Sequence, residues 1–129
     1  MAEAENGWSF SSMRLDGKSC IAAGVGGLGQ AVALGLADAG GDMIVADLNL
    51  EAAEQVAARI REAGKKAFAI KLDVSRPVES QKVVDFAVDK FGKLDVLFNG
   101  VGINIRGPSI DVTEAQWDKL HSVNLKGAF

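Results

Sequence analysis

Short apolar segments and segments with helical spacing alternate along this chain from residue 18 onward. The apolar segments are continuous or alternating, and they are short enough to be strands buried in a sheet. Strands are predicted for residues 19–23, 43–47, 66–72 and 94–98. Helices are predicted for residues 28–39 and 50–63, from Ser75 or Pro77 to Phe91, and from Thr113 onward, with a loop at 99–112.

Residue types that start and stop helices stand at the ends of these segments. Asn49 and Thr113 can accept hydrogen bonds from the free backbone N–H groups of a first helical turn. Gly40, Gly64 and Gly92 follow the last helical residues, where glycine is a preferred terminator. These boundaries support a strand followed by a helix, repeated four times.

Strands that alternate with helices through short connections form a parallel sheet with right-handed crossovers and helices on both faces. We therefore predict an α/β domain with a doubly wound sheet, whose four strands take the order 3-2-1-4. The domain is expected over residues 15–129. Residues 1–14 show no clear period and are expected to be a flexible tail.

The charge balance and the cysteine content narrow the possible functions. The formal net charge is −3, the pI is about 5.1 and no basic run is present, which argues against nucleic-acid binding. No apolar run approaches the length of a membrane span, about 18 residues, and residues 1–15 do not resemble a signal peptide. The single Cys20 cannot form an internal disulfide, so a cytoplasmic protein is expected. His121 has no second histidine or cysteine near it, and no metal site is expected.

Glycine or small polar residues follow each predicted strand. The positions are the loop Gly24–Gly29, Asp47, Asp73 and Asn99. In a parallel sheet these carboxyl ends meet at one edge, where doubly wound proteins bind ligands. The glycine loop leads straight into a helix N-terminus, whose free N–H groups and dipole favour a phosphate. Taken alone, the same loop is also compatible with a tight structural turn.

Asp47 makes the expected ligand more specific. It follows Gly29 at close to the spacing of about 20 residues that separates a phosphate loop from the acidic residue binding a ribose 2′-hydroxyl. A carboxylate there repels a 2′-phosphate, and neither Leu48 nor Val25 supplies a cation to offset it. We therefore predict NAD rather than NADP as the cofactor, with a solvated strand-end aspartate as the alternative.

Four short motifs follow one another along the chain. They are Ala-Ala-Gly-Val-Gly-Gly-Leu-Gly at 22–29, Asp-Val at 73–74, Asn-Gly-Val-Gly at 99–102 and Val-Asn-Leu-Lys-Gly at 123–127. Together they resemble the front half of the short-chain dehydrogenase/reductase family, with its Thr-Gly-x-x-x-Gly-x-Gly and Asn-Asn-Ala-Gly patterns. The resemblance covers residues 15–129 and implies a Rossmann-type NAD(P)-binding domain that is present only in part.

The resemblance implies roles for the motif residues. In the family the glycine loop binds the cofactor, the Asp of the Asp-Val pair contacts the adenine, and an asparagine that Asn124 matches helps to hold a catalytic water relay. The cofactor-binding residues expected from it are Gly24, Gly27, Leu28, Gly29, Asp47, Leu48, Asp73, Val74, Asn99 and Val101.

Three positions depart from the family patterns. Ala22 stands in place of the threonine, Ala23 in place of the first loop glycine, and Gly100 in place of the second asparagine. The methyl group of Ala23 costs about 1 kcal/mol if its φ angle is positive and nothing if it is negative. Gly100 removes an amide that would tie the end of the fourth strand to its surroundings.

A larger departure concerns the catalytic residues. The family uses a tyrosine whose pKa is lowered by a lysine, together with a serine, and these normally follow the helix with which this chain ends. The chain contains no tyrosine, so of that set only Asn124 is present. Positioned acid–base groups supply about 10²–10⁴-fold of rate. We therefore expect the 129-residue chain to be a fragment that is inactive alone, with its fourth strand left as an open edge.

The substrate is expected to be a small molecule. Residues 27–30, 33–37 and 102–106 are most similar to the sugar-acid branch of the family, which includes gluconate 5-dehydrogenase-like and 2-deoxygluconate 3-dehydrogenase-like enzymes. The implied substrate is a sugar acid or polyol, whose carboxylate Arg106 can pair with; an exposed loop arginine is the alternative. The full-length form is expected to be a homo-oligomer.

Two other functions stay open as alternatives. The chain could be a non-catalytic nucleotide-binding or interaction module. It could also be an S-adenosylmethionine methyltransferase, a class that uses a glycine loop and an acidic residue on its second strand as well. The motifs around Asn99 and Asn124 disfavour the methyltransferase.

Overall fold

The computed structural model describes residues 10–129. The strands are β1 (Ser19–Ala23), β2 (Asp42–Asp47), β3 (Ala67–Lys71) and β4 (Val96–Asn99). The helices are α1 (Gly27–Asp38), α2 (Leu50–Glu62), α3 (Pro77–Phe91) and α4 (Glu114–His121), with short 3-10 turns η1 (Phe10–Met13) and η2 (Ser109–Asp111) and a π-helical turn η3 (Ser122–Lys126).

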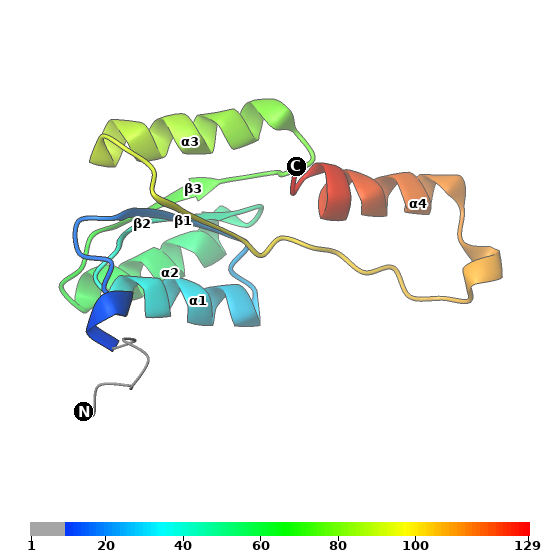
Figure 1. The fold of residues 1–129 in the computed structure, drawn as a ribbon. Helices are drawn as coiled ribbons and strands as arrows, with labels where there is room; N and C mark the ends of the chain where they lie inside the picture. The colour runs from blue at the N-terminus through cyan, green and yellow to red at the C-terminus, as the bar shows by residue number, and fades with distance from the viewer. Residues whose placement is uncertain (1–9) are drawn as a thin grey trace.

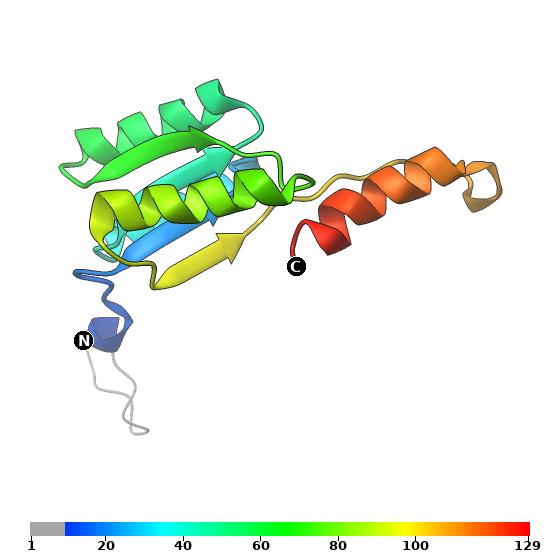
Figure 2. The ribbon, with the colours of Figure 1, turned by 90° about the horizontal axis from the view of Figure 1, so that it is seen from above.

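The four strands form one parallel sheet in the order β3-β2-β1-β4, which confirms the predicted order. Helices α1 and α2 cover one face of this sheet and α3 covers the other (Figure 1). Seen from above, α3 lies along the strands and β4 is the outer strand on one side (Figure 2). The predicted α/β class with helices on both faces is therefore correct.

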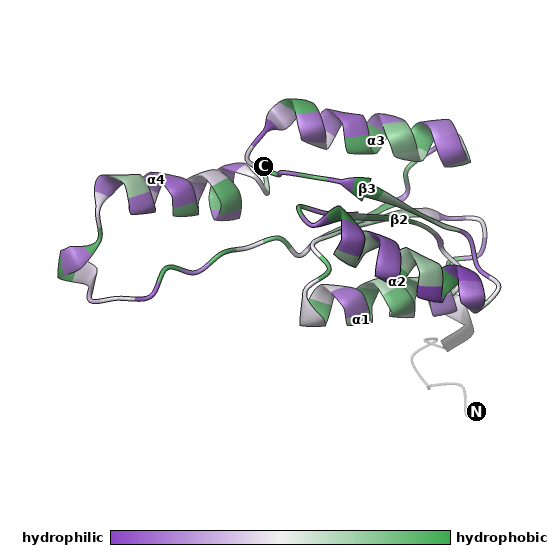
Figure 3. Cartoon of the chain, turned by 180° about the vertical axis from the view of Figure 1, so that it is seen from behind, coloured by the Kyte–Doolittle hydropathy of each residue, from purple (hydrophilic) through white to green (hydrophobic). Residues whose placement is uncertain are grey.

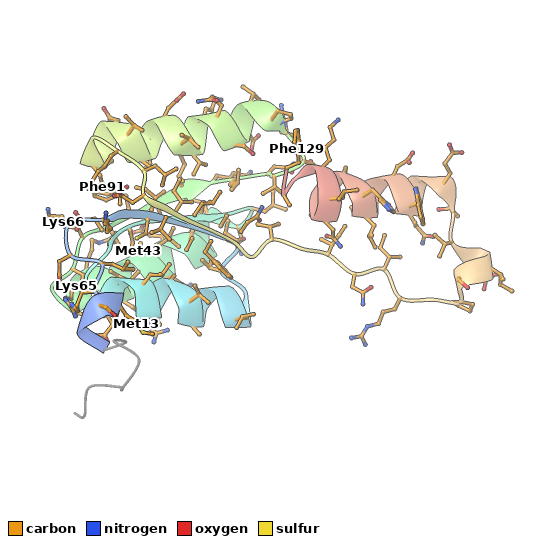
Figure 4. All side chains as sticks on the ribbon, in the orientation of Figure 1. Met13, Met43, Lys65, Lys66, Phe91 and Phe129 are labelled. Carbon is orange, nitrogen blue, oxygen red and sulfur yellow. The ribbon has the colours of Figure 1, made fainter. Side chains whose placement is uncertain are left out.

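The core follows from the two-residue period of the strands. Every residue of β1 is buried, and its successive side chains point to opposite faces. Cys20 and Ala22 join Met43 and the alanines of α1 and α2 in one cluster, with Met43 between the sheet and these helices (Figure 4). Ile21 and Ala23 belong to a second cluster, which includes apolar residues of α3. Two half-cores therefore hold β1 in the centre of the sheet.

The last part of the chain extends away from these layers. The loop after β4 runs outward from the sheet, and α4 returns beside this loop towards the end of the sheet from which it left (Figures 1 and 2). Apolar and polar residues alternate along this arm (Figure 3). Two of its large side chains are exposed, Trp117 by 59% and Leu125 by 67%. Across residues 10–129, none of the helices combines the length and the apolar character needed to cross a bilayer.

The predicted helix starts at Asn49 and Thr113 are confirmed. The Asn49 side chain accepts a hydrogen bond from the Ala52 N–H, and Thr113 forms a reciprocal capping box with Gln116. The suggested start at Ser75 is wrong, because the Ser75 hydroxyl donates to Asp73 and α3 begins at Pro77. The final helix also differs: it ends at His121 and continues as the π-helical turn η3.

The fourth strand is shifted from its predicted bounds of 94–98. The Asp95 N–H donates to the Ser19 carbonyl at 2.9 Å, but the Ser19 N–H donates to the Asp95 carboxylate, also at 2.9 Å, rather than to a backbone carbonyl. This side chain replaces one bond of the ladder, so β4 starts at Val96 and extends to Asn99. The third strand is one residue shorter at each end than the prediction of 66–72.

Part of the predicted tail can be compared with the structure. Residues 1–9 lie outside the described residues, whereas Phe10–Met13 form η1. The chain then contacts the end of α1, where the Leu15 N–H donates to the Ala39 carbonyl at 2.8 Å. Arg14 also donates to the Asp38 carbonyl. These bonds attach the segment before β1 to the domain.

Candidate cofactor site

The glycine loop begins where β1 ends, and Gly24 sets its direction. Gly24 has a φ angle of +82°, a conformation that strongly favours glycine. Its N–H donates to the Ala46 carbonyl at 2.8 Å, which joins the loop to β2. A Cβ atom here would lie 2.9 Å from backbone atoms of Gly100 and Val101. Gly24 therefore allows the ends of β1 and β4 to approach each other.

The first turn of α1 lies directly against this loop. A Cβ atom on the buried Gly29 would overlap the Gly24 carbonyl oxygen. Gly27, in contrast, faces open space with no atom within 4 Å of its Cβ position, and Leu28 is 76% exposed. Gly26 is the N-cap residue and provides no side chain, so the first N–H groups of α1 have no side-chain acceptor. The helix N-terminus is thus open to an anion.

The two alanines that depart from the family pattern are compatible with this geometry. Ala22 and Ala23 lie inside β1 and are buried, with exposed fractions of 0% and 4%. Within residues 10–129, no residue other than glycine has a positive φ angle. The methyl group of Ala23 therefore causes no backbone strain, and the left-handed turn falls one residue later, on Gly24.

Asp47, at the end of β2, contacts the glycine loop. Its Oδ2 accepts the Val25 N–H at 2.8 Å, and its Oδ1 accepts the Asn49 N–H, also at 2.8 Å. The neighbouring Leu48 is 62% exposed at the same edge. The Asp47 carboxylate therefore stands next to the glycine loop.

Asp73 is held in a turn after β3. The Ser75 hydroxyl donates to Asp73 Oδ1 at 2.6 Å, and the Ser75 N–H donates to the same oxygen at 3.0 Å. These hydrogen bonds, chiefly that of the hydroxyl, lower the pKa of Asp73 below its ordinary value. The Asp73 N–H donates to Glu79 at 2.8 Å, and the next residue, Val74, is buried. The side chain at this position is thus a fixed, ionised acceptor.

The end of β4 completes the edge. The Gly100 N–H donates to the Ala23 carbonyl at 2.8 Å, and the Val101 N–H points to Asn99 Oδ1 at 3.4 Å. A Cβ atom on Gly100 would overlap the ring of Phe98 and approach the Ala23 carbonyl oxygen to 3.2 Å. The ring thus occupies the space that a larger residue at position 100 needs, which explains the glycine there.

Asn124 connects two segments that are distant in sequence. Its Oδ1 accepts the Ile103 N–H and its Nδ2 donates to the Ile103 carbonyl, both at 2.8 Å. The amide therefore uses one donor and one acceptor to hold the loop after β4 against η3. π-Helical turns such as η3 are frequent at functional sites.

Arg106 is separated from the other predicted residues. It lies on the exposed loop that runs away from the sheet (Figure 1) and lines a small hollow of about 110 Å³ near Asp111 and Gln116. The structure therefore gathers the glycine loop, Asp47, Asp73 and Asn99 at one edge but does not bring Arg106 to it. Within residues 10–129, histidine, cysteine and acidic side chains do not gather in groups of three that could hold a metal.

A larger apolar hollow lies beside this edge, between α3, β4 and the end of the chain. Its volume is about 470 Å³. Its lining includes Ile21, Leu72, Val83, Leu97 and Phe129. Leu97 is 59% exposed because α3 packs on β1 and β2 rather than on β4. The hollow also borders Val74 and Asn99 and is therefore continuous with the candidate site.

Several residues that shape the site were not predicted from the sequence. They are Val25, Phe98, Ile103, Ser75 and Glu79. Serine two residues after an aspartate is a common turn arrangement, so the role of Ser75 was open to prediction. Val25 and Ile103 contribute backbone N–H groups to the site, so their residue types do not reveal these roles in the sequence.

Comparison with known proteins agrees with this geometry. A model of the short chain dehydrogenase family matches residues 18–129. The chain is 36% identical over 124 residues to 7alpha-hydroxysteroid dehydrogenase of Escherichia coli strain K12, covering 95% of this chain and 48% of the relative. It is 38% identical to versicolorin reductase of Emericella nidulans, covering 94% and 47% of the two chains. Neither name belongs to the sugar-acid branch.

A solved structure gives the same result in three dimensions. The crystal structure of a hydroxysteroid dehydrogenase from Escherichia coli superposes with a TM-score of 0.87 at 33% identity, covering 92% of this chain and 51% of that one. The chain therefore spans about half the length of the curated relatives that it matches. On the family model, the identity to these relatives and the shared fold, this chain belongs to the short-chain dehydrogenase family.

Proposed function

We propose that this chain is the cofactor-binding part of an NAD-dependent oxidoreductase that acts on a CH–OH group. The observation that carries the proposal is the shared edge of the sheet. There, the open N-terminus of α1, the Asp47 carboxylate and the Asp73 turn stand side by side at the ends of parallel strands. The phosphate, ribose and adenine groups of one dinucleotide require three such environments, arranged in this order along the edge of the sheet.

The residues present fit such a cofactor. The pyrophosphate would lie on the backbone of Gly24, Gly27, Leu28 and Gly29, where the exposed first turn of α1 leaves space. Asp47 and Leu48 would contact the adenosine ribose, and Asp73 and Val74 the adenine. Asn99 and Val101, at the end of β4, would contact the cofactor further along the edge.

The preference for NAD over NADP rests on Asp47. Its carboxylate accepts hydrogen bonds from two backbone N–H groups and keeps acceptor sites for ribose hydroxyls. A 2′-phosphate placed there would meet like charge, and the neighbouring Leu48 offers no cation. We expect NADPH to bind more weakly than NADH.

Bound NAD would supply hydride transfer to or from the substrate carbon. Asn124 contributes by holding the Ile103 backbone, and with it the loop that follows Asn99. The chain has no tyrosine that could exchange a proton with a substrate oxygen. We therefore expect the 129-residue chain to bind the cofactor without catalysing turnover.

The substrate proposal is a sugar acid or a polyol, with Arg106 as the partner of a carboxylate. It is supported by the sequence of residues 102–106 and by the exposed position of this loop. The names of the relatives point to other hydroxy and keto compounds, so the substrate needs its own test. In a full-length protein, Arg106→Ala should raise the KM for a sugar acid; an unchanged KM would remove Arg106 from the substrate site. A cytoplasmic homo-oligomer is proposed for that full-length form.

Calorimetric titration of the purified chain tests the cofactor proposal directly. NADH, NADPH and S-adenosylmethionine are compared under one set of conditions. Binding of NADH that is tighter than that of the other two supports the proposal. Equal or tighter binding of NADPH would overturn the NAD preference, and binding of S-adenosylmethionine alone would favour a methyltransferase.

A non-catalytic nucleotide-binding or interaction module is the alternative to this proposal. Sequencing the gene beyond codon 129 separates the two functions. A downstream serine and Tyr-x-x-x-Lys would support the enzyme, whereas a stop codon would support the module.

A further inference from the structure

The Asp47 carboxylate already has two backbone partners, and they belong to different segments. Its Oδ2 accepts the Val25 N–H, within the glycine loop, and its Oδ1 accepts the Asn49 N–H, which precedes α2. Both distances are 2.8 Å, as expected for hydrogen bonds to an ionised acceptor. The side chain therefore joins the loop after β1 to the loop after β2.

Few other bonds hold the glycine loop in its shape. Glycine has more conformational freedom than any other residue, so a loop of glycines is ordered only by its hydrogen bonds and packing. Gly24 bonds to the Ala46 carbonyl, and Gly26 lacks a side-chain cap. The bonds of Gly24 and Val25 thus attach two successive loop residues to the last two residues of β2.

The bond to Val25 is the stronger of these two attachments. A hydrogen bond to a charged group contributes about twice as much as one between neutral groups. Val25 itself is buried, with 6% of its surface exposed, so water competes poorly for its N–H. Removal of the acceptor would leave the Val25 N–H without a partner and would leave the Gly24 bond as the remaining hydrogen bond from the loop to β2.

We propose that Asp47 is a positioning residue that holds the phosphate-binding loop in its binding conformation before the cofactor arrives. One carboxylate then has two functions, ordering the pyrophosphate cradle and selecting the ribose. This inference rests on the proposed nucleotide function. Its consequence is that a change at Asp47 weakens the binding of any ligand with an adenosine diphosphate group, even one that lacks the ribose hydroxyls.

A pair of ligands separates this effect from ribose recognition. ADP carries the ribose 2′- and 3′-hydroxyls, and 2′,3′-dideoxy-ADP lacks both. If Asp47 acts only through ribose, Asp47→Asn does not lower the affinity for 2′,3′-dideoxy-ADP. Loss of a negative charge beside a diphosphate would by itself raise that affinity. If Asp47 positions the loop, the same variant lowers it, because the one oxygen of an amide cannot accept both the Val25 N–H and the Asn49 N–H.

The experiment titrates both ligands into the wild type and Asp47→Asn by calorimetry. Asp42→Asn is the matched control, because it removes the same charge at the opposite end of β2, where Asp42 pairs with Lys66. We expect Asp47→Asn to weaken 2′,3′-dideoxy-ADP binding about tenfold and Asp42→Asn to leave it unchanged. Unchanged or tighter binding to Asp47→Asn would overturn the positioning role.

Amide hydrogen exchange of the ligand-free protein provides a second readout. The Val25 N–H should exchange slowly in the wild type and about tenfold faster in Asp47→Asn. If that variant does not fold, the wild type still decides the matter: a Val25 amide that exchanges as fast as that of Gly27 would contradict the inference. A wild type that binds no ADP would instead refute the nucleotide proposal itself.

Discussion

The contact between Gly29 and Gly24 makes a quantitative prediction about the glycine loop. Gly29→Ala adds one methyl group in the first turn of α1, where its Cβ would overlap the Gly24 carbonyl oxygen. Both partners are backbone, so relief requires the helix and the loop to move apart. Insertion of a methyl group into a closely packed position costs about 1–3 kcal/mol.

The same helix contains a matched control. Gly35 lies two turns later, is exposed, and has no atom within 4 Å of its Cβ position. Replacement of a helical glycine by alanine gains about 1 kcal/mol from helix propensity. Gly35→Ala should therefore stabilise the protein by about 0.5–1 kcal/mol. Gly29→Ala obtains the same gain but loses about 1–3 kcal/mol to the overlap.

Urea denaturation followed by circular dichroism measures both free energies of unfolding. We expect Gly29→Ala to be less stable than Gly35→Ala by about 1–3 kcal/mol. ADP binding to Gly29→Ala should also weaken, because the loop that moves is the proposed phosphate site. If the two variants were equally stabilised, the close approach of helix and loop would be refuted.

Three further predictions address other parts of the chain. Gly100→Asn should destabilise the protein by about 1–3 kcal/mol, because its Cβ meets the Phe98 ring; addition of Phe98→Val should restore part of this loss in urea denaturation, and a purely additive double variant would argue against the contact. Thr113→Ala removes the cap of α4 and should reduce local stability by about 1 kcal/mol, seen as faster amide exchange in the first turn of α4 but not in α3. The Ser19 N–H lowers the pKa of Asp95 more than the nearby lysines do. The stability that Asp95 contributes is therefore present above its unfolded pKa of about 3.9. It is lost as the pH falls through the lower pKa of the folded state. Asp95→Asn should therefore reduce the free energy of unfolding at pH 7 and flatten its decline in acid, and an unchanged acid slope would count against this assignment.

The fold was largely predictable because its signals are local. Runs of apolar residues separated by glycines indicated buried strands. Asn49 and Thr113 marked helix starts, because their side-chain oxygens accept hydrogen bonds from backbone N–H groups only three residues later. The same holds for the candidate site as a region. A glycine loop, Asp47 and Asp73 each follow a strand, and parallel strands place their ends together.

The details of the site depend on contacts that the sequence pattern does not show. The start of β4 was misjudged because the Asp95 side chain, rather than a backbone carbonyl, accepts the Ser19 N–H. The substitution of Gly100 was attributed to a lost amide, whereas the Phe98 ring explains why a larger residue does not fit. Neither relationship produces a periodic pattern. The first depends on how β1 and β4 are aligned, and the second on where the Phe98 ring lies in the folded chain.

The sequence alone determined the order of elements, the parallel sheet and the residues that stand at the carboxyl ends of its strands, because hydrophobic period, helix caps and glycine positions act over a few residues. Only the tertiary structure decided which of these residues touch. It joins Asp47 to Val25 and Asn124 to Ile103, and it leaves Arg106 on a loop outside the group. These pairings arise when separate strands and loops are packed together, so their geometry exists only in the folded chain.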